Sequence, residues 1–98
     1  MPLFSIYALD RRPDGPTIRA ETRPAHLEYL RRLGDKLKAA GPIMCNHDEG
    51  VVAGSLIVIE ADNRDAAVTI AENDPYEKAG LFVSTDIREY KWLFPEKG

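Results

Sequence analysis

The sequence predicts an α+β protein with a ferredoxin-like fold, in which an antiparallel sheet carries both helices on one face. Two observations lead to this prediction. Apolar or alternating segments typical of strands occur at residues 3–9, 54–61 and 81–94, with a shorter one after residue 42. Segments with helical spacing follow the first strand and the third. The resulting order, strand–helix–strand–strand–helix–strand, is that of a split βαβ fold.

The first strand is followed by a segment of very different composition. Residues 3–9 are almost entirely apolar and include aromatic and β-branched side chains, which favour a buried strand. Residues 10–24 contain three prolines and one glycine. We therefore expect a long connection there, with room for one short helical turn.

The first helix is predicted over residues 25–41. Thr22 is a suitable N-cap, and Pro24 falls in the first turn, where its missing N–H costs nothing. Gly41, followed by a proline, predicts the helix end. The apolar residues of the inner face recur with helical spacing. They are Leu30, Leu33 and Leu37.

The second half of the chain begins with a predicted hairpin. A short strand and a polar turn within residues 42–54 lead into the apolar strand 54–61. Asp62 or Asn63 is expected to cap a second helix over residues 64–73. Its inner residues are predicted to be Ala67, Ile70 and Ala71. The last strand, residues 81–94, has Trp92 and Phe94 near its end.

The chain of 98 residues has the length of a single small domain, spanning residues 1–98. Hydrophobic residues occupy both faces of the strands at 3–9 and 54–61, so exposing either face would be unfavourable at roughly 25 cal/mol per Å² of apolar area. We therefore expect a sheet-to-sheet homodimer, in which a second copy of the chain covers the face that carries no helix.

The composition of the chain limits the kinds of partner that the protein can bind and the cellular compartment in which we expect it. The net charge of −3 and the pI near 5.3 argue against a nucleic-acid surface. No apolar run is long enough to span a membrane, and the first residues lack the layout of a signal peptide. The single cysteine, Cys45, excludes an internal disulfide. We expect a cytoplasmic protein without nucleic-acid or membrane partners.

His26 is a candidate catalytic residue because it falls on the apolar face of the first predicted helix. Most histidines in such positions are hydrogen-bonded core residues, and that interpretation carries about half the weight. The alternative is a general base. A position near the predicted helix start favours the neutral imidazole that a base needs.

Asp74 is the second candidate, in the segment AENDPYEKAGLF at residues 71–82. An aspartate before a proline commonly ends a helix and starts a turn. Asp74 also continues the inward direction of Ala67 and Ile70, where a carboxylate could orient an imidazole. Whether Asp74 and His26 meet cannot be read from spacing, because the two helices of this fold run roughly parallel.

Further residues are candidates for binding a substrate. Arg23 could pair with a carboxylate, and the hydroxyl and N–H of Ser55 could bind a substrate oxygen. Tyr76 offers a polar tip beside Asp74. Tyr7 and Phe82 are predicted to form an apolar wall.

No metal or cofactor is predicted. Cys45, His47, Asp48 and Glu49 are all ligand types, but neighbours on one polar turn cannot easily converge on one ion. No glycine-rich segment has the spacing of a dinucleotide or phosphate loop, and no nucleophile elbow is present.

Several segments together resemble the YciI-like (YCII-related) family. They are TRPAHLEYL, AGPIM, GSLIVIEA, AENDPYEKAGLF and IREYKWLF. The resemblance covers nearly the whole chain and is most specific in the D-P-Y segment and the upstream R-x-x-H. It implies a dimeric α+β barrel, of the same broad class as muconolactone isomerase. It also implies a pocket centred on His26 and Asp74, and a few members are linked to dehydrochlorination in aromatic catabolism.

Two hypotheses of function follow. The first is a cofactor-independent enzyme, an isomerase or a dehydrochlorinase-like lyase, in which His26 transfers a proton on a small cyclic or carboxylated molecule and Asp74 orients the imidazole. The alternative is a non-catalytic dimeric module that binds a small ligand or a protein partner, with His26 and Asp74 in a structural role.

Overall fold

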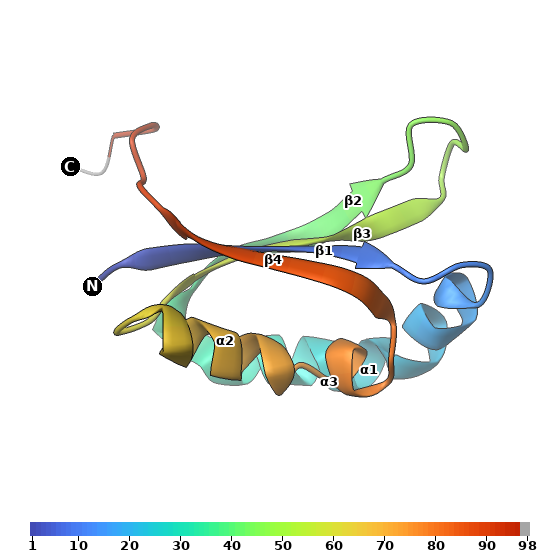
Figure 1. Cartoon of the computed structure of the whole chain (residues 1–98), viewed down its shortest axis with the longest axis horizontal. Helices are drawn as coiled ribbons and strands as arrows, with labels where there is room; N and C mark the ends of the chain where they lie inside the picture. Colours follow the sequence, from blue (N-terminus) through green and yellow to red (C-terminus); the bar gives the residue numbers. More distant parts are fainter. Residues whose placement is uncertain (97–98) are drawn as a thin grey trace.

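A computed structural model describes residues 1–96 of the chain and confirms the ferredoxin-like class. The four strands form one antiparallel sheet in the order β2-β3-β1-β4, and all helices lie on one face of it (Figure 1). The elements in chain order are β1 (Leu3–Asp10), α1 (Gly15–Leu33), a 3-10 turn η1 (Gly34–Lys36), β2 (Leu37–Met44), β3 (Val52–Glu60), α2 (Arg64–Glu72), α3 (Pro75–Lys78) and β4 (Phe82–Tyr90).

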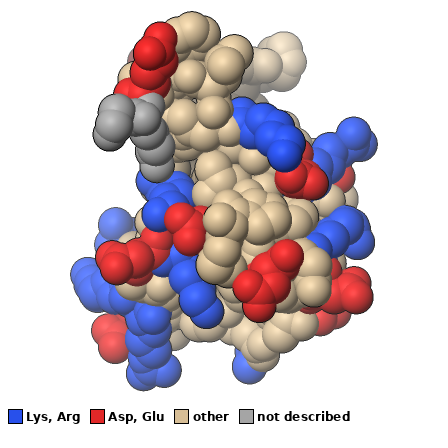
Figure 2. Space-filling view, turned by 90° about the vertical axis from the view of Figure 1, so that its left-hand side faces the viewer, with Lys and Arg blue, Asp and Glu red and all other residues tan. Residues whose placement is uncertain are grey.

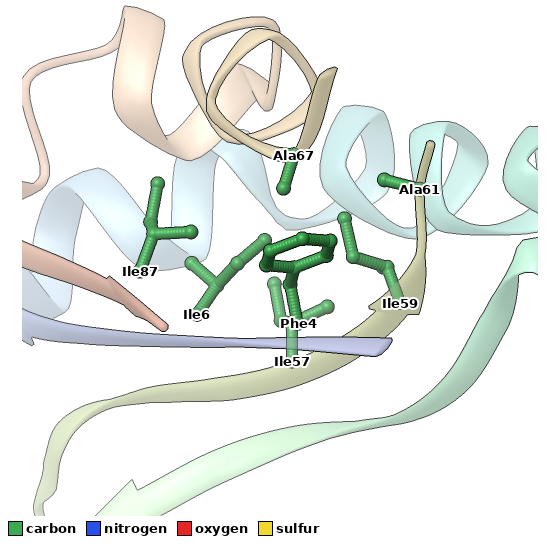
Figure 3. Packing of buried hydrophobic residues seen from close by; sticks show 7 residues of the cluster. All are labelled: Phe4, Ile6, Ile57, Ile59, Ala61, Ala67 and Ile87. Atoms are coloured by element: carbon green, nitrogen blue, oxygen red, sulfur yellow. The ribbon is translucent and has the colours of Figure 1, made fainter. Parts of the chain in front are cut away.

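The hydrophobic core lies between the sheet and the helix layer. Ile6 of β1 stands opposite Ile57 of β3 on one side and Ile87 of β4 on the other, so these three neighbouring strands present a continuous apolar row. Figure 3 shows Ile6 and Ile87 pointing from the sheet toward the helices, with Ala67 of α2 facing them. Because side chains alternate along a strand, the residues between these point to the opposite, helix-free face.

The first helix begins much earlier than the sequence predicted. α1 starts at Gly15 with Pro16 in its first turn, and Pro24 lies inside it. The predicted connection over residues 10–24 and the predicted cap at Thr22 are therefore wrong. Pro16 is acceptable because the first N–H groups of a helix have no intrahelical partner. Pro24 removes one hydrogen bond from the helix interior, a cost that the packing of α1 must offset.

The same helix also ends earlier than predicted. Gly34, whose φ of 56° suits glycine, follows its last residue, Leu33. Residues predicted as the last turns of the helix form β2 instead, so Gly41 and Pro42 lie within a strand. Pro42 is tolerated there because β2 is an edge strand of the sheet.

The elements of the second half agree more closely with prediction. The side chain of Asn63 accepts a 2.9 Å hydrogen bond from the backbone N–H of Ala66 and caps α2. β4 occupies the middle of the predicted last strand, and Trp92 and Phe94 lie beyond its end. Within residues 1–96, the structure has no helix with the length and apolar character needed to cross a membrane.

Candidate active site

His26 and Asp74 meet beneath the sheet. The Nδ1 atom of His26 lies 2.8 Å from Oδ1 of Asp74, and both side chains are buried. The contact joins α1 to the segment between α2 and α3. His26 lies in the middle of α1 rather than near its start, so the expected influence of the helix dipole on its imidazole does not apply.

Asp74 is both a helix cap and the partner of the histidine. Its backbone is extended, and its Oδ1 accepts a 2.9 Å hydrogen bond from the N–H of Tyr76 in the first turn of the short helix α3, which begins at Pro75. Asp74 therefore has a structural role, but it caps the start of α3 rather than the end of α2, whose C-cap is Asn73. The same oxygen also contacts His26, so one carboxylate both caps a helix and holds the imidazole.

The hydrogen bond determines which ring nitrogen carries the proton in a neutral His26. An ionised carboxylate has no proton to donate, so Nδ1 must be the donor in this contact. In the neutral ring, Nε2 then keeps its lone pair. His26 lines a cavity, and in this tautomer Nε2 is the ring nitrogen able to accept a proton.

The ring of Tyr76 packs against one face of the His26 imidazole and holds it in place. The two rings stack with centroids 3.9 Å apart and planes 16° from parallel. Phe82 contacts the phenol ring edge-on at 6.1 Å. Burial raises the pKa of Tyr76, and the cation of Arg19 offsets part of that rise. Its hydroxyl is therefore protonated at neutral pH and available as a hydrogen-bond donor.

Arg19 is a site residue that the sequence analysis missed. It makes two hydrogen bonds to Asp10, of 2.9 and 2.8 Å, and a third of 3.0 Å to the hydroxyl oxygen of Ser55. Its guanidinium carbon also lies 4.8 Å from the ring centre of Tyr76. The prolines of residues 10–24 predict a connection there, and a connection has no helical face on which Arg19 would be placed. Arg19 and Arg23 precede His26 by seven and three residues, a helical spacing that indicates that all three share one face of a helix.

These polar groups border a cavity of about 300 Å³, here called the His26 cavity. It lies between α1 and the strands β2 and β3. Arg19, Arg23 and His26 line it from α1, Ser55 from β3 and Tyr76 from α3, and apolar residues including Leu27, Pro42 and Val52 complete its wall. Arg23 is exposed and makes no ion pair with any residue that the structure describes. The cavity thus combines a proton acceptor, an unpaired cation and hydrogen-bond donors.

Ser55 is placed by its neighbour Gly54. A Cβ atom at residue 54 would collide with the carbonyl oxygen of Ala8 on β1. The absence of a side chain therefore allows β1 and β3 to approach at this point. Ser55, next in the strand, faces the helices and is buried.

Two of the predicted wall residues have other positions. Tyr7 alternates with the buried residues Ile6 and Ala8, and therefore points to the helix-free face of the sheet, away from His26. Its predicted role as a wall of this site is not supported by the geometry. Phe82 supports Tyr76 and lines a different cavity, which also includes Asp74.

Comparisons with known proteins agree with this fold and identify the family. Residues 3–91 match the family described as YCII-related domain. Protein YciI from Escherichia coli O6:H1 is 35% identical over 98 residues, covering 94% of this chain and 99% of its own. An uncharacterised protein from Haemophilus influenzae is 30% identical, covering 93% and 98%.

Solved structures provide the second comparison. A 5-chloro-2-hydroxyhydroquinone dehydrochlorinase from Burkholderia phenoliruptrix, in complex with 2,5-dihydroxybenzoquinone, is similar with a TM-score of 0.80 and 36% identity, covering 91% of this chain and 93% of that one. A putative antibiotic biosynthesis monooxygenase from Nitrosomonas europaea, with a TM-score of 0.55 and 15% identity, covers 96% and 100% and shares the fold. The family match and the identity to these relatives lead to one conclusion: the chain belongs to the YCII-related family.

Proposed function

We propose that the protein is a cofactor-independent enzyme that transfers a proton on a small hydroxylated or carboxylated ring. The observation that carries this proposal is the 2.8 Å contact between His26 and Asp74, with His26 lining a cavity. The contact leaves Nε2 as the basic atom. A core histidine with a purely structural role would not need to border a cavity of about 300 Å³.

An elimination is the reaction that these groups support best. Nε2 of His26 takes the proton of a ring hydroxyl, and the O–H electron pair forms a carbonyl bond. The ring carbon that bears the leaving group takes up a proton and becomes tetrahedral. A second ring hydroxyl then loses its proton, its O–H electron pair forms a second carbonyl bond, and the neighbouring ring double bond shifts to expel the leaving group, such as chloride, with its bonding pair. The products are a quinone-like ring, chloride and a proton, so the balance requires no oxidant. Asp74 stabilises the imidazolium that forms on the way.

One cation and one hydroxyl group are the proposed substrate-binding groups, and a second cation positions the residues beside them. Arg23, at the exposed side of the cavity, is the group to bind a carboxylate or phenolate. Arg19 is already neutralised by Asp10, so it acts by fixing Ser55 and by contacting Tyr76. The protonated Tyr76 can donate to a substrate oxygen. The dehydrochlorinase that is 36% identical, solved with a dihydroxybenzoquinone, supports this substrate class.

We further propose that the protein forms a homodimer through the helix-free face of the sheet. Tyr7, Leu9 and Leu56 are 43%, 36% and 42% exposed on that face. Contiguous apolar surface of this kind commonly marks an interface. Figure 2 shows a different side of the molecule, the left-hand side of Figure 1, where charged side chains of both signs are interspersed.

The enzymatic proposal is tested by assaying chloride release from 5-chloro-2-hydroxyhydroquinone, the compound in the name of the similar dehydrochlorinase. His26→Ala should abolish release in protein that circular dichroism shows to be folded at the assay temperature, although the loss of a buried partner of Asp74 lowers its melting temperature. The matched control is His47→Ala, which removes the other histidine, an exposed one, and should retain full activity. Equal activity of the two variants would refute the role of His26. No turnover in the unmodified protein would favour the binding-module alternative for this compound.

A further inference from the structure

A second cavity, of about 310 Å³, lies between the helices and the other half of the sheet. We call it the α2 cavity. Ile6, Ile57 and Ile87 line it from the sheet, and Val68, Ile70 and Ala71 line it from α2. In Figure 3, Ile6 and Ile87 point from their strands toward the helix layer, where this cavity lies.

The His26–Asp74 pair stands between the two cavities. His26 lines the His26 cavity, and Asp74 lines the α2 cavity. Leu30, Ser55 and Ile57 border both. The two cavities are therefore neighbours, and the polar groups Arg19, Arg23 and Tyr76 line the His26 cavity and not the α2 cavity. The two compartments therefore differ in chemistry although they share a wall.

From this arrangement we propose that the α2 cavity is a separate binding site for an uncharged, apolar ring-shaped molecule. Apolar cavities of about half this volume bind benzene-sized molecules. The isoleucines of the sheet, Val68 and Phe82 give this cavity an apolar surface beside its charged groups. Where that surface faces empty space it lacks packing partners, and an apolar ligand restores those contacts. The site does not depend on the reaction proposed for His26.

The charges around the cavity exclude an anionic ligand. Glu72 and Glu77 line it together with Asp74, whose Oδ1 is held by His26 and Tyr76. The one cation in its lining, Arg64, is exposed and donates through Nε to the carbonyl of Ile87 at 3.2 Å. Three carboxyl groups against one arginine repel a carboxylate ligand. The His26 cavity, with Arg23 unpaired, has the opposite preference.

The test uses two ring-shaped probes, neutral indole and anionic benzoate, and follows the backbone amide signals of the whole chain by ¹H–¹⁵N NMR. Indole at millimolar concentration should shift the signals of Val68, Ile70, Ala71 and Ile87. Benzoate should shift those of Arg23, His26 and Val52 instead. Absence of any indole-induced shift, or indole shifts centred on Val52, would overturn the proposal.

Two matched variants locate the sites. Val68→Phe places a ring in the α2 cavity, and Val52→Phe places the same ring in the His26 cavity. Val68→Phe should weaken indole binding at least about tenfold and leave benzoate binding unchanged, and Val52→Phe should do the reverse. If Val68→Phe does not fold, Ala71→Leu fills the same cavity with a smaller group. Indole binding that survives the α2-cavity variant, or is lost in Val52→Phe, contradicts a separate site. Because neither readout involves turnover, this result is independent of the chloride-release assay.

Discussion

The side chains of His26 and Asp74, 48 positions apart in the sequence, meet through a 2.8 Å hydrogen bond between the middle of α1 and the start of α3. One oxygen of Asp74 accepts from both His26 and the N–H of Tyr76. The carboxylate therefore fixes the histidine tautomer and begins a helix at once. These two tasks need different properties, a charge for the first and only an acceptor oxygen for the second.

Asp74→Asn separates the two tasks. The amide oxygen can still accept from the Tyr76 N–H, but the side chain can no longer stabilise an imidazolium by charge. We expect chloride release to fall about 10²- to 10⁴-fold with little change in stability. Asp74→Ala should lose activity to a similar extent and also about 1 kcal/mol of unfolding free energy, because the cap is gone. Urea unfolding and the release assay measure the two effects. Retained activity in Asp74→Asn would show that the charge has no role.

Removing one partner of the ion pair between Arg19 and Asp10 should strongly destabilise the fold. Its side chains are 14% and 5% exposed, and the contact is bidentate. Arg19→Met leaves a buried carboxylate without a partner, which we expect to cost about 3–5 kcal/mol in urea unfolding. Adding Asp10→Asn should restore part of the loss, because the unpaired charge is then removed.

Arg88→Met is the matched control for this prediction. Arg88 also pairs with an aspartate, Asp86, at 2.9 Å, but the side chains are 78% and 55% exposed. Solvent weakens such a pair, so the change should stay within about 0.5 kcal/mol. If Arg19→Met and Arg88→Met lose similar amounts of unfolding free energy, burial of the Arg19 pair does not have the effect that we assign to it.

The sequence predicts the second half of the molecule better than the first because its signals are local. Asn63 caps α2 with its own side chain, and β3 is a run of apolar residues with no competing helical pattern. The limits of α1 depend instead on tertiary packing. Prolines at positions 16 and 24 indicate a break, yet the helix continues through Pro24 because its face packs under the sheet. Leu37 fits a helix by spacing, but pairing with Ile59 places it in β2.

The candidate site was predicted in part for the same reason. His26 and Asp74 were found from their inward directions, which spacing within each helix provides. Their contact required the turn between α2 and α3, which redirects Asp74 toward α1 and cannot be seen in a periodic pattern. Arg19 was missed because it lies in the segment predicted as a connection. Tyr7 was misplaced because a period of two does not reveal which face of a strand meets the helices.

The phenol groups of Tyr29 and Tyr76 should ionise at a higher pH in the native protein than in the unfolded chain. Burial raises the pKa of both above the ordinary value of 10.0, with Asp74 adding to the effect at Tyr29. A raised pKa in the folded state means that the associated stability is fully present below pH 10 and is lost as pH rises through the higher folded values. The near-ultraviolet absorbance of tyrosinate can be followed as a function of pH. Part of the absorbance change of the four tyrosines should occur at a higher pH in the native protein than in the protein unfolded in urea.

Tyr29→Phe and Tyr76→Phe assign the delayed signal. Each variant should remove one part of it and leave the earlier part unchanged. Superimposable curves for the native and the urea-unfolded protein would contradict burial of these hydroxyl groups.

Leu56→Glu should convert the proposed dimer to a monomer. Leu56 lies on the helix-free face, directly opposite Tyr7 on β1, so a carboxylate there would meet apolar surface of the second copy. Stable interfaces bury about 1,200–2,000 Å² in total, and a charge near the centre of such an area is poorly tolerated. Sedimentation velocity should show a dimer for the unmodified chain and a monomer for the variant. The control is Ala20→Glu, which adds the same charge at an exposed position of α1, in the helix layer, and should remain dimeric. A monomeric unmodified chain, or an Ala20→Glu variant that dissociates as Leu56→Glu does, would show that this face is not the interface.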